Sequence, residues 1–428
     1  MPADSQLDPR YEKARQLLAS GHARAAAALL EVLVRESPDA ARWNDWASAQ
    51  RLLARPDQAA EGYYRALESN PWCWQALGNL GLLWSEQRRW REAAPALERA
   101  VACQGGARAP EALRREAARA RREAGPGAGA AAGGLRLLWI HDQLPESDRS
   151  GAEQRVAVLL AELQRQGHAV TYWARAGAGQ ERYLRPLARL CARIFYGDSA
   201  RLRWQGDQPA AACLEDLLAG ERFDAAIVSH WHWNVWSCAE QYLPLLRQWA
   251  PTTRVVVLSE DHHGLREERL AALTGHWADQ ERARNYSARE LDVYRRADLV
   301  WGVSSADRAS LLRRDPGLKI EVLPPLAEPA PPGPDWAGRE GLVFLGEYSN
   351  PANRDGVDWF LGAIWPQVRE RLPEVRLHLV GSHLTDSYAR QPGIVADGFA
   401  PELGPVFARH RLAICPIRFG TGITTKNL

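Results

Sequence analysis

Residues 135–142 read LRLLWIHD, and residues 150–170 read SGAEQRVAVLLAELQRQGHAV. The first run is short and apolar and ends in polar residues, which is typical of a buried parallel strand. In the second run, apolar residues recur at i, i+3, i+4 and i+7 from Val156, and Gly167 is placed to end a helix. AVTYWAR then reads as the next strand. This stretch therefore predicts a strand–helix–strand unit in a parallel sheet.

The same alternation continues on both sides of a proline-rich segment. Apolar runs before it are FDAAIVSH, RVVVLSED, ADLVWGVS and IEVLPP, and those after it are GLVFLGEY, VRLHLVGS, GIVADGF and LAICPI. A helix is expected over DGVDWFLGAIWPQVRERLP. Two βαβ regions joined by a semi-rigid connector predict two doubly wound α/β domains that face each other across a cleft.

The amino-terminal region repeats itself with an offset of 34 residues. The matched positions are Trp43/Leu77, Trp46/Leu80, Ala47/Gly81, Ala59/Ala93, Tyr63/Leu97 and Ala66/Ala100. Alternating large and small residues lets the two helices of a unit close tightly and stack on the next unit, which is the tetratricopeptide (TPR) pattern. PEALRREAARARREAG reads as a polar capping helix. The alternative is a plain helical bundle.

These patterns divide the chain into five parts. Residues 1–123 are expected to form TPR repeats with their capping helix, and residues 124–134 an Ala/Gly linker. Residues 135–323 form the first α/β domain, residues 324–341 the proline-rich connector, and residues 342–428 the second α/β domain. The predicted fold class is thus a helical TPR array followed by two Rossmann-like domains, the second of them incomplete.

Composition excludes several function classes. The net charge is +2, with 25% charged and 46% hydrophobic residues, so a global basic field for nucleic acid is absent. The six cysteines are scattered without a CxxC pair or a zinc-type Cys/His cluster, which indicates a reducing compartment and no metal site. The polar amino terminus and the lack of an ~18-residue apolar run predict no signal peptide and no transmembrane segment. We expect a cytoplasmic protein and leave peripheral membrane contact open.

Histidines and an aspartate follow two of the expected strands. His230 and His232 come after FDAAIVS, and Asp261 and His263 come after VVVLSE. In doubly wound sheets ligands bind at the carboxyl ends of strands, where such groups can hydrogen-bond a sugar hydroxyl or a developing anion. For each histidine, a structural role under a loop is the alternative. Gly151, at a helix start, could admit a phosphate or an acceptor, or it could simply form a turn.

The carboxyl-terminal CPIRFGTGITTKNL has the composition of an anion site. Arg418 and Lys426 flank Gly420-Thr421-Gly422, and glycine-exposed amides with basic side chains suit a diphosphate. The spacing is not that of a P-loop. Gly346 and Asn353 occupy a polar loop after the first strand of the second domain.

The region from Leu135 onward resembles the GT-B glycosyltransferases of family four, a large retaining family that uses nucleotide-sugar donors. The resemblance is carried by SGAEQRVAVLLAELQRQGHAV, DHHGLREERL, LVFLGEYSNPANRDGVDWF, VRLHLVGS and DGFAPELGPVFARHRLAICPIRFGTGI. It implies metal-independent sugar transfer, with no cofactor beyond the nucleotide-sugar substrate. Arg418 and Lys426 match its basic pair near the donor diphosphate, and His230 or His232 matches its active-site histidine.

The remaining expectations also follow from this resemblance. Gly151, Glu153 and Arg266 are candidates for an acceptor or phosphate loop. The family's donor domain continues with a helix that carries paired glutamates, which this sequence does not reach, so we expect the 428-residue chain to be inactive. The acceptor is a glycan, a lipid-linked glycan or a protein, and the TPR groove is expected to bind a protein or peptide. A non-enzymatic TPR scaffold with a degenerate glycosyltransferase body is the alternative.

Overall fold

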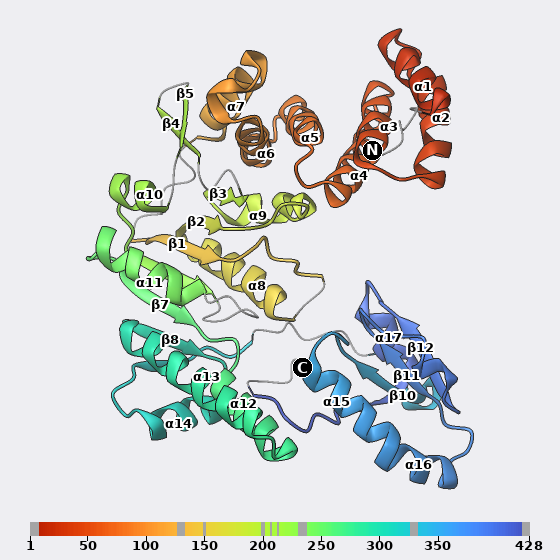
Figure 1. Ribbon diagram of the computed structural model, residues 1–428, viewed down its shortest axis with the longest axis vertical. Coiled ribbons are helices and arrows are strands. Elements are labelled where there is room, and N and C mark those ends of the chain that lie inside the picture. The colour runs from red at the N-terminus through yellow and green to blue at the C-terminus, as the bar shows by residue number, and fades with distance from the viewer. Residues whose placement is uncertain are drawn as a thin grey trace, which may run out of the picture. The chain divides into compact units, whose positions relative to one another are not determined.

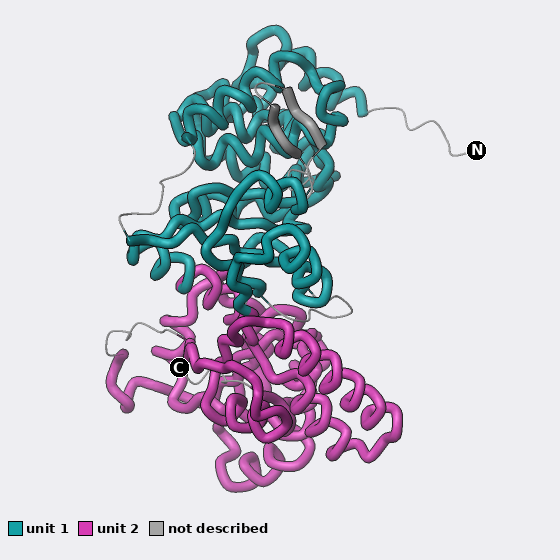
Figure 2. Tube along the Cα trace, turned by 90° about the vertical axis from the view of Figure 1, so that its left-hand side faces the viewer, with its two compact units in different colours: residues 1–146, 159–256 teal, residues 147–158, 257–428 magenta. Residues whose placement is uncertain are grey.

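The computed structural model shows a helical array followed by α/β regions (Figure 1). It describes residues 8–125, 133–148, 151–197, 202–205, 208–211, 214–229, 238–325 and 333–421. The chain divides into two compact units, coloured in Figure 2: residues 1–146 with 159–256, and residues 147–158 with 257–428. No helix among the described residues is both long and apolar enough to cross a membrane.

The amino-terminal array consists of helices that each pack on the next. They are α1 Pro9–Ala19, α2 Ala23–Glu36, α3 Ala40–Leu52, α4 Pro56–Ser69, α5 Trp74–Glu86, α6 Trp90–Cys103 and α7 Glu111–Ala124, with a 3₁₀ turn at Gly106–Arg108. Asp8 caps α1 by accepting the Arg10 N–H, and Asp39 caps α3 by accepting the Arg42 N–H. The predicted fold class of helical repeats followed by parallel α/β domains is confirmed.

Small residues allow the helices of a pair to approach closely. A Cβ at Gly62 would lie 2.8 Å from the Cβ of Ala47, and a Cβ at Gly81 would lie 2.5 Å from the Cγ of Leu97. Neither distance is compatible with a side chain, so both glycines are needed for the α3–α4 and α5–α6 pairs. Leu80 is fully buried in the same layer.

Polar contacts repeat with the period of the sequence. The Tyr11 hydroxyl donates to Asp45 at 2.8 Å across 34 residues, and the Asn79 amide donates to Asn44 at 3.0 Å across 35 residues. Arg51 donates to Glu86 at 3.2 Å, again across 35 residues. These hydrogen bonds link equivalent faces of successive helical pairs.

The first α/β region is built on a seven-stranded sheet with the order β3-β2-β1-β6-β7-β8-β9. The strands are β1 Arg136–His141, β2 Ala169–Ala174, β3 Arg193–Tyr196, β6 Ala225–Ser229, β7 Arg254–Leu258, β8 Leu299–Gly302 and β9 Ile320–Val322. The β1–β2, β1–β6, β2–β3 and β8–β9 pairs are parallel. Counted without the β4–β5 hairpin, the order is that of a Rossmann sheet.

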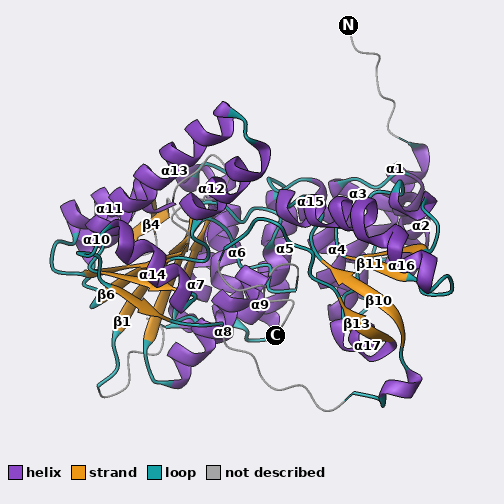
Figure 3. Ribbon diagram, turned by 90° about the horizontal axis from the view of Figure 1, so that it is seen from below, coloured by secondary structure: helices purple, strands orange, loops and turns teal. Residues whose placement is uncertain are grey.

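Helices flank these strands, as Figure 3 shows. They are α8 Gly151–Arg165, α9 Leu184–Leu190, α10 Leu214–Gly220, α11 Cys238–Trp249, α12 His263–Thr274, α13 Trp277–Arg296 and α14 Ser305–Arg314, with a 3₁₀ turn at Glu181–Tyr183. Gly167 has a φ of 83° just after α8, as its predicted capping position requires. The short strand β3 and the antiparallel hairpin of β4 Leu202–Gln205 and β5 Gln208–Ala211 were not expected from the sequence.

A buried ion pair joins the array to the sheet within the first unit. Arg99 of α6 and Glu181 have fully buried side chains and are hydrogen-bonded to each other. The Arg99 guanidinium also donates to the Pro71 carbonyl at 2.6 Å and lies 5.5 Å from the centre of the Tyr196 ring. Burial raises the pKa of Glu181 to about 7, against the opposing charge of Arg99. Removal of either side chain would therefore leave the other charge buried without its counter-charge.

The second α/β region has a four-stranded sheet with the order β12-β11-β10-β13, and its pairs are all parallel. Its strands are β10 Glu340–Leu345, β11 Leu377–Val380, β12 Ile394–Gly398 and β13 His410–Ala413. Its core contains Phe344, Leu377 and Leu379. The order reverses between β10 and β13, which makes the carboxyl ends of these two strands the place where a ligand is expected.

The helix of this region differs in detail from the expectation. It begins at Pro351, earlier than predicted, because Asn350 accepts the Ala352 N–H and starts α15 (Pro351–Trp359). A π-helical turn at Phe360–Ile364 then precedes α16 (Trp365–Arg371). Pro366 has no N–H for a regular helical bond, which accounts for the interruption. The last helix is α17 (Leu403–Arg409), and short 3₁₀ turns lie at Trp336–Gly338 and Tyr388–Arg390.

Candidate functional site

The loop that connects β7 to α12 is held by hydrogen bonds from buried side chains. We call residues 259–263 the Asp261 loop. The Tyr294 hydroxyl, from α13, lies 2.7 Å from the Ser259 hydroxyl oxygen. Ser259 in turn donates to the Asp261 carbonyl at 3.1 Å. These two hydrogen bonds fix the backbone around Asp261.

Glu290 of α13 is completely buried and binds the start of α12. Its carboxylate accepts the backbone N–H groups of His263 at 3.0 Å and Gly264 at 3.1 Å. The Nδ1 atom of His262 lies 2.8 Å from the same carboxylate. A negative charge at a helix amino terminus is favourable, because the unpaired N–H groups there carry partial positive charge. Glu290 therefore sets the position of the Asp261 loop.

Gly264 makes this close packing possible. A Cβ at this position would lie 2.9 Å from the Ser287 Cα atom, would overlap the Ser287 hydroxyl, and would lie 3.0 Å from Glu290 Oε2. The glycine in the sequence HHGL is thus required for the approach of α13 to α12, and not for a positive φ.

Asp261 has the properties of a proton-exchanging group. Burial, with a smaller contribution from the charges of Glu290 and Asp307, raises the pKa of its carboxyl to about 6, against the opposing charge of Arg266. Arg266 Nη1 lies 3.0 Å from Asp261 Oδ2. A carboxyl that titrates near neutral pH can accept or hold a proton at the reacting atoms.

A second carboxyl with a raised pKa lies next to Asp261 in the chain. Burial raises the pKa of Glu260 to about 7; Arg155 opposes this shift, and Glu153 and Asp261 add to it. Arg155 Nη1, from the first half of α8, lies 3.1 Å from Glu260 Oε2. Arg155 also donates to the Leu323 carbonyl at the end of β9. The loop thus carries two carboxyls that are poised near pH 7.

The predicted donor segment contacts this loop within the second unit. The Thr421 hydroxyl donates to an Asp261 carboxylate oxygen, and its oxygen lies 3.1 Å from the His262 carbonyl. Arg269 of α12 donates to the Gly420 carbonyl. The structure therefore brings together Asp261, Gly420 and Thr421, which the sequence had assigned separately to the catalytic and the donor-binding groups.

Arg418 has a different partner. Its Nε donates to Asp355 Oδ2 at 2.9 Å, a second guanidinium nitrogen pairs with the other oxygen, and the guanidinium lies 5.8 Å from the centre of the Trp359 ring. Both Asp355 and Trp359 belong to α15. A diphosphate that binds Arg418 would have to compete with this carboxylate.

Gly346 and Asn353 lie on the loop after β10. The Asn353 amide donates to the Glu347 carbonyl at 2.9 Å and shapes the loop. A Cβ at Gly381, just after β11, would overlap the Gly346 carbonyl oxygen, so the two loops are in backbone contact. Gly346 follows β10 and residues 418–421 follow β13, so both groups flank the point where the strand order reverses.

The acceptor-side candidates divide into two groups. Arg266 binds Asp261, and the charge of the buried Glu153 raises the pKa of Glu260, so both belong to the loop environment. Gly151 is exposed at the first position of α8. His263 is half-buried and contributes its backbone N–H to Glu290.

Four of the predicted site residues, His230, His232, Gly422 and Lys426, lie outside the described residues. Their assignments stay predictions. The metal-free character of the site and the five-part division of the chain also stay predictions.

Sequence reasoning missed several residues that shape the site. Glu260 directly precedes Asp261 after a predicted strand and could have been found by the same rule. Arg155 lies in the quoted SGAEQR stretch, where its spacing to Glu260 gives no signal. Glu290 and Tyr294 form an i, i+4 pair in a highly charged helix, which resembles an exposed face, yet both are buried.

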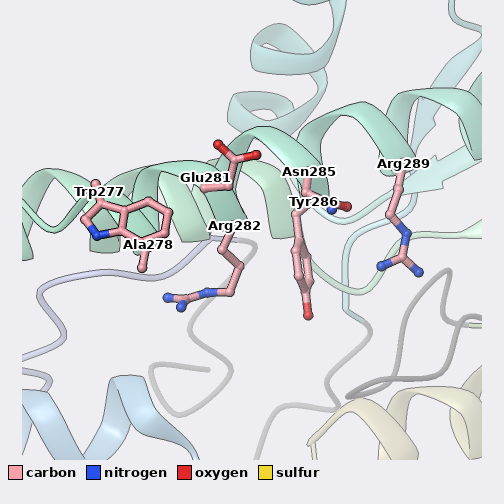
Figure 4. A pocket seen from close by; sticks show the side chains of 7 residues that line it. All are labelled: Trp277, Ala278, Glu281, Arg282, Asn285, Tyr286 and Arg289. Carbon is pink, nitrogen blue, oxygen red and sulfur yellow. The ribbon is translucent and has the colours of Figure 1, made fainter.

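A pocket of about 370 Å³ lies along one face of α13 (Figure 4). Its lining residues recur at helical spacing: Trp277, Ala278, Glu281, Arg282, Asn285, Tyr286 and Arg289. Arg282 pairs with Glu267 at 2.7 Å, and Glu267 lies 3.3 Å from Arg266, which binds Asp261. A chain of ion pairs thus connects the pocket to the Asp261 loop.

Two family models match adjoining parts of the chain. Residues 149–329 match Glycosyltransferase Family 4, and residues 339–428 match Glycosyl transferases group 1. The first segment contains the Asp261 loop, and the second contains Gly346, Arg418 and Thr421. No curated protein matches the chain.

Several solved structures share low similarity with it. A mutant of the O-GlcNAc transferase from Thermobaculum terrenum is 14% identical, with 95% of this chain and 77% of that chain covered and a TM-score of 0.37. A mutant of S. aureus TarM, in complex with fondaparinux, α-GlcNAc-glycerol and UDP, is 12% identical over 48% of this chain and 41% of that chain, with a TM-score of 0.34. The Sgt2 TPR domain from Aspergillus fumigatus is 20% identical over 29% of this chain and 84% of that chain, with a TM-score of 0.26.

Together the two matches cover every strand of the two parallel sheets except β1. The matched segments follow each other in the chain, one for each sheet region, and between them they contain every described site residue. Residues 149–329 and 339–428 therefore belong to the glycosyltransferases, as a family 4 segment followed by a group 1 segment.

Proposed function

We propose that this protein is a retaining glycosyltransferase that transfers a sugar from a nucleotide-sugar donor to an acceptor hydroxyl. The observation that carries the proposal is the contact of Thr421 with Asp261. It joins a glycine-rich segment suited to a diphosphate with a carboxyl that titrates near pH 6. A transferase needs these two groups within reach of one substrate.

The donor diphosphate is assigned to the segment after β13. Glycines expose backbone N–H groups, and basic side chains supply the charge that a diphosphate requires. Gly420, Thr421 and Gly422 form the proposed cradle, with Arg418 and Lys426 as its cations. Gly346 and Asn353 border it from the loop after β10. We propose that Lys426, and Arg418 once released from Asp355, neutralise the leaving diphosphate, so that no bound metal is needed.

Asp261 is proposed to act at the sugar. In the reaction, the bond between the anomeric carbon and the diphosphate oxygen breaks, and a bond from the anomeric carbon to the acceptor oxygen forms on the same face. The acceptor hydroxyl loses its proton, and ionised Asp261 is placed to accept it. His263 and the two histidines after β6, His230 and His232, are further candidates for contacts to the sugar. Gly151, Glu153 and Arg266 are assigned to the acceptor side.

The acceptor is a glycan, a lipid-linked glycan or a protein, and the helical array is proposed to bind a protein or peptide. The pocket on α13 is a candidate for part of the acceptor surface, because ion pairs connect it to Asp261 and because Trp277 and Tyr286 offer aromatic faces. The five described cysteines form no disulfide with one another. This agrees with a location in the cytoplasm, where we place the reaction.

The test uses the protein expressed from its complete gene. A panel of uridine, guanosine and thymidine diphosphate sugars is titrated by calorimetry with and without a chelator, and the anomeric configuration of any product is read by NMR. We expect one donor to bind in the presence of chelator and to yield a product with retained configuration. Lys426→Ala should weaken binding by at least about 10-fold, the effect of losing one charge-assisted contact of about 1.5–3 kcal/mol.

Lys13→Ala is the matched control, because Lys13 is exposed on α1 and should leave donor binding unchanged. An absence of binding to every donor would contradict the transferase proposal. Equal binding by the Lys426→Ala variant would place the diphosphate elsewhere, and an inverted product would contradict the retaining mechanism alone.

A further inference from the structure

Two histidines and an aspartate meet on the four-stranded sheet, away from the site described above. They are His378 of β11, Asp397 of β12 and His410 of β13. One ligand atom from each lies within 4.8 Å of the other two. The centres of the two imidazole rings are 4.4 Å apart. Three residues far apart in sequence thus place two ring nitrogens and a carboxylate oxygen around one point.

The strand between the two histidines leaves room for this arrangement. β10 lies between β11 and β13, and its second residue is Gly341, with a φ of 63°. A Cβ at Gly341 would lie 2.8 Å from the Arg376 carbonyl oxygen and 3.8 Å from the His378 ring. Because no side chain separates the rings, His378 and His410 come together across an intervening strand.

Hydrogen bonding defines the tautomer of His410. Its Nδ1 lies 2.7 Å from the Val406 carbonyl oxygen, which can only accept, so Nδ1 carries the proton. The lone pair is therefore on Nε2. This side chain is only 5% exposed, and Nε2 is buried with no hydrogen-bond partner among the described residues. A buried acceptor without a partner is rare in proteins and calls for an explanation.

His378 is oriented by the third member of the group. Its Nδ1 lies 2.8 Å from Asp397 Oδ2. This short contact places a ring nitrogen and a carboxylate oxygen side by side as two ligand atoms, and the backbone carbonyl at His410 Nδ1 is a usual partner of a metal-binding imidazole.

We propose that His378, Asp397 and His410 bind one divalent transition-metal ion of the zinc class. Two imidazole nitrogens and a carboxylate oxygen are preferred ligands of such an ion, and a water completes a tetrahedron. Magnesium and calcium prefer all-oxygen ligand sets and fit less well. The ion would tie together β11, β12 and β13.

This site does not belong to the donor chemistry. His410 is the first residue of β13, whereas Arg418, Gly420 and Thr421 follow the last residue of that strand. His378 is likewise the second residue of β11. The ion is therefore expected to stabilise the sheet, and its removal should leave nucleotide-sugar binding intact.

The test measures metal binding directly on the untagged full-length protein. Cobalt(II) is added to metal-free protein, and tetrahedral coordination is read from the visible d–d absorption bands. Zinc is then titrated by competition and by calorimetry, and the melting temperature is recorded with and without zinc. We expect one equivalent to bind, intense visible bands, and a zinc-dependent rise in melting temperature.

Variants identify the ligands. His410→Gln and His378→Gln should each remove the visible bands and the stabilisation by zinc, and Asp397→Asn should weaken zinc binding by about 10–100-fold. His383→Asn is the matched control, because His383 is an exposed histidine of the same region, and asparagine tolerates its φ of 59°. This variant should bind zinc like the unmodified protein.

The result that overturns the proposal is retention of the cobalt bands or the zinc equivalent by both His378→Gln and His410→Gln. Absence of one-equivalent binding to the unmodified protein overturns it as well. Circular dichroism of the metal-free variants shows whether they are folded. His378 is the more exposed histidine of the two, so its variant keeps the test decisive if His410→Gln fails to fold.

Discussion

The helical array and the Asp261 loop are stabilised by contacts of different kinds. In the array, polar contacts recur across 34 or 35 residues, as in the Tyr11–Asp45 and Asn44–Asn79 pairs, and the layers between them are apolar. In the Asp261 loop, the partners Arg155 and Glu260 are 105 residues apart, and Thr421 and Asp261 are 160 residues apart. These sequence separations do not follow a repeat period.

The two regions differ in the charged groups that they bury. The array is packed mainly by small and large apolar residues, and its buried Arg99 is paired with Glu181 where α6 meets the sheet. The loop buries Glu290 and raises the pKa of both Asp261 and Glu260. Burial of this kind disfavours ionisation and reduces stability at neutral pH, which is a common feature of catalytic sites. We therefore expect the loss of an apolar side chain in the array to reduce stability, and the loss of a carboxyl in the loop to reduce activity.

Asp261→Asn should have the largest effect, on activity. Because burial raises the pKa of Asp261 from 3.8 to about 6, the active ionised form accumulates as the pH rises through about 6. We expect the kcat/KM of sugar transfer to show an acid limb near that pH. The variant should lose this limb and about 10²–10⁴-fold in rate, the usual contribution of a general base.

The folding stability of the unmodified protein should vary with pH in the opposite sense to its activity. In the unmodified protein, the free energy of unfolding falls as the pH rises from 3.8 to about 6, because ionised Asp261 is disfavoured in the folded state. Urea titrations of Asp261→Asn should lack this fall. Asp386→Asn, at an exposed carboxylate, is the control. An unchanged pH–rate profile in Asp261→Asn would remove Asp261 from the mechanism.

Leu80→Ala tests the apolar core of the array. Leu80 is fully buried between α5 and its neighbours, so the variant should lose about 2–5 kcal/mol in the free energy of unfolding. The measurement is a urea titration that follows helical circular dichroism. Leu52→Ala, at an exposed position of α3, should change the free energy of unfolding by less than about 0.5 kcal/mol. Equal effects of the two variants would contradict the repeat packing.

Gly264→Ala tests the close packing beside the loop. The added Cβ would lie 2.9 Å from the Ser287 Cα atom, so α12 and α13 must separate. We expect a loss of about 1–3 kcal/mol in unfolding free energy, and lower donor turnover because Glu290 no longer holds the loop. Gly404→Ala is the control, since a Cβ there meets no atom within 4 Å. It should be neutral or slightly stabilising.

Tyr11→Phe should have the smallest effect. It removes only the hydrogen bond to Asp45 at 2.8 Å, and the expected loss in the free energy of unfolding is about 0.5–1.5 kcal/mol. Thermal unfolding of the full chain measures it. A loss as large as that of Leu80→Ala would mean that polar links, and not the apolar layer, hold the array together.

Local patterns were sufficient to predict the fold class. The strands at 136–141 and 169–174 and the helix that ends at Gly167 follow the apolar spacing of the sequence, because each buries one continuous face. The four-residue strand β3 is too short to show a pattern. The helix over 351–371 is interrupted where Pro366 lacks an N–H, an effect that apolar spacing does not reveal.

The candidate site was less accessible to sequence reasoning. Asp261 and Thr421 could be proposed because each follows a predicted strand. Glu290 could not, because its role depends on the approach of α13 to Gly264, which is a tertiary contact. His378 and His410 have no metal-binding spacing in the sequence, and their rings meet only because the backbone of Gly341 carries no side chain between them.

The asparagine contact in the array bears on how this protein could change over generations. Asn79 of α5 donates to Asn44 of α3, 35 residues earlier in the preceding helical pair. A duplicated segment inserted between them would bring its own asparagine, which could bond in both directions, so gene duplication could lengthen the array without leaving an unpaired amide. The Arg99–Glu181 pair has no such counterpart. We therefore expect growth or loss of repeats to be tolerated upstream of α6, and the last helical pair to be retained together with the transferase region.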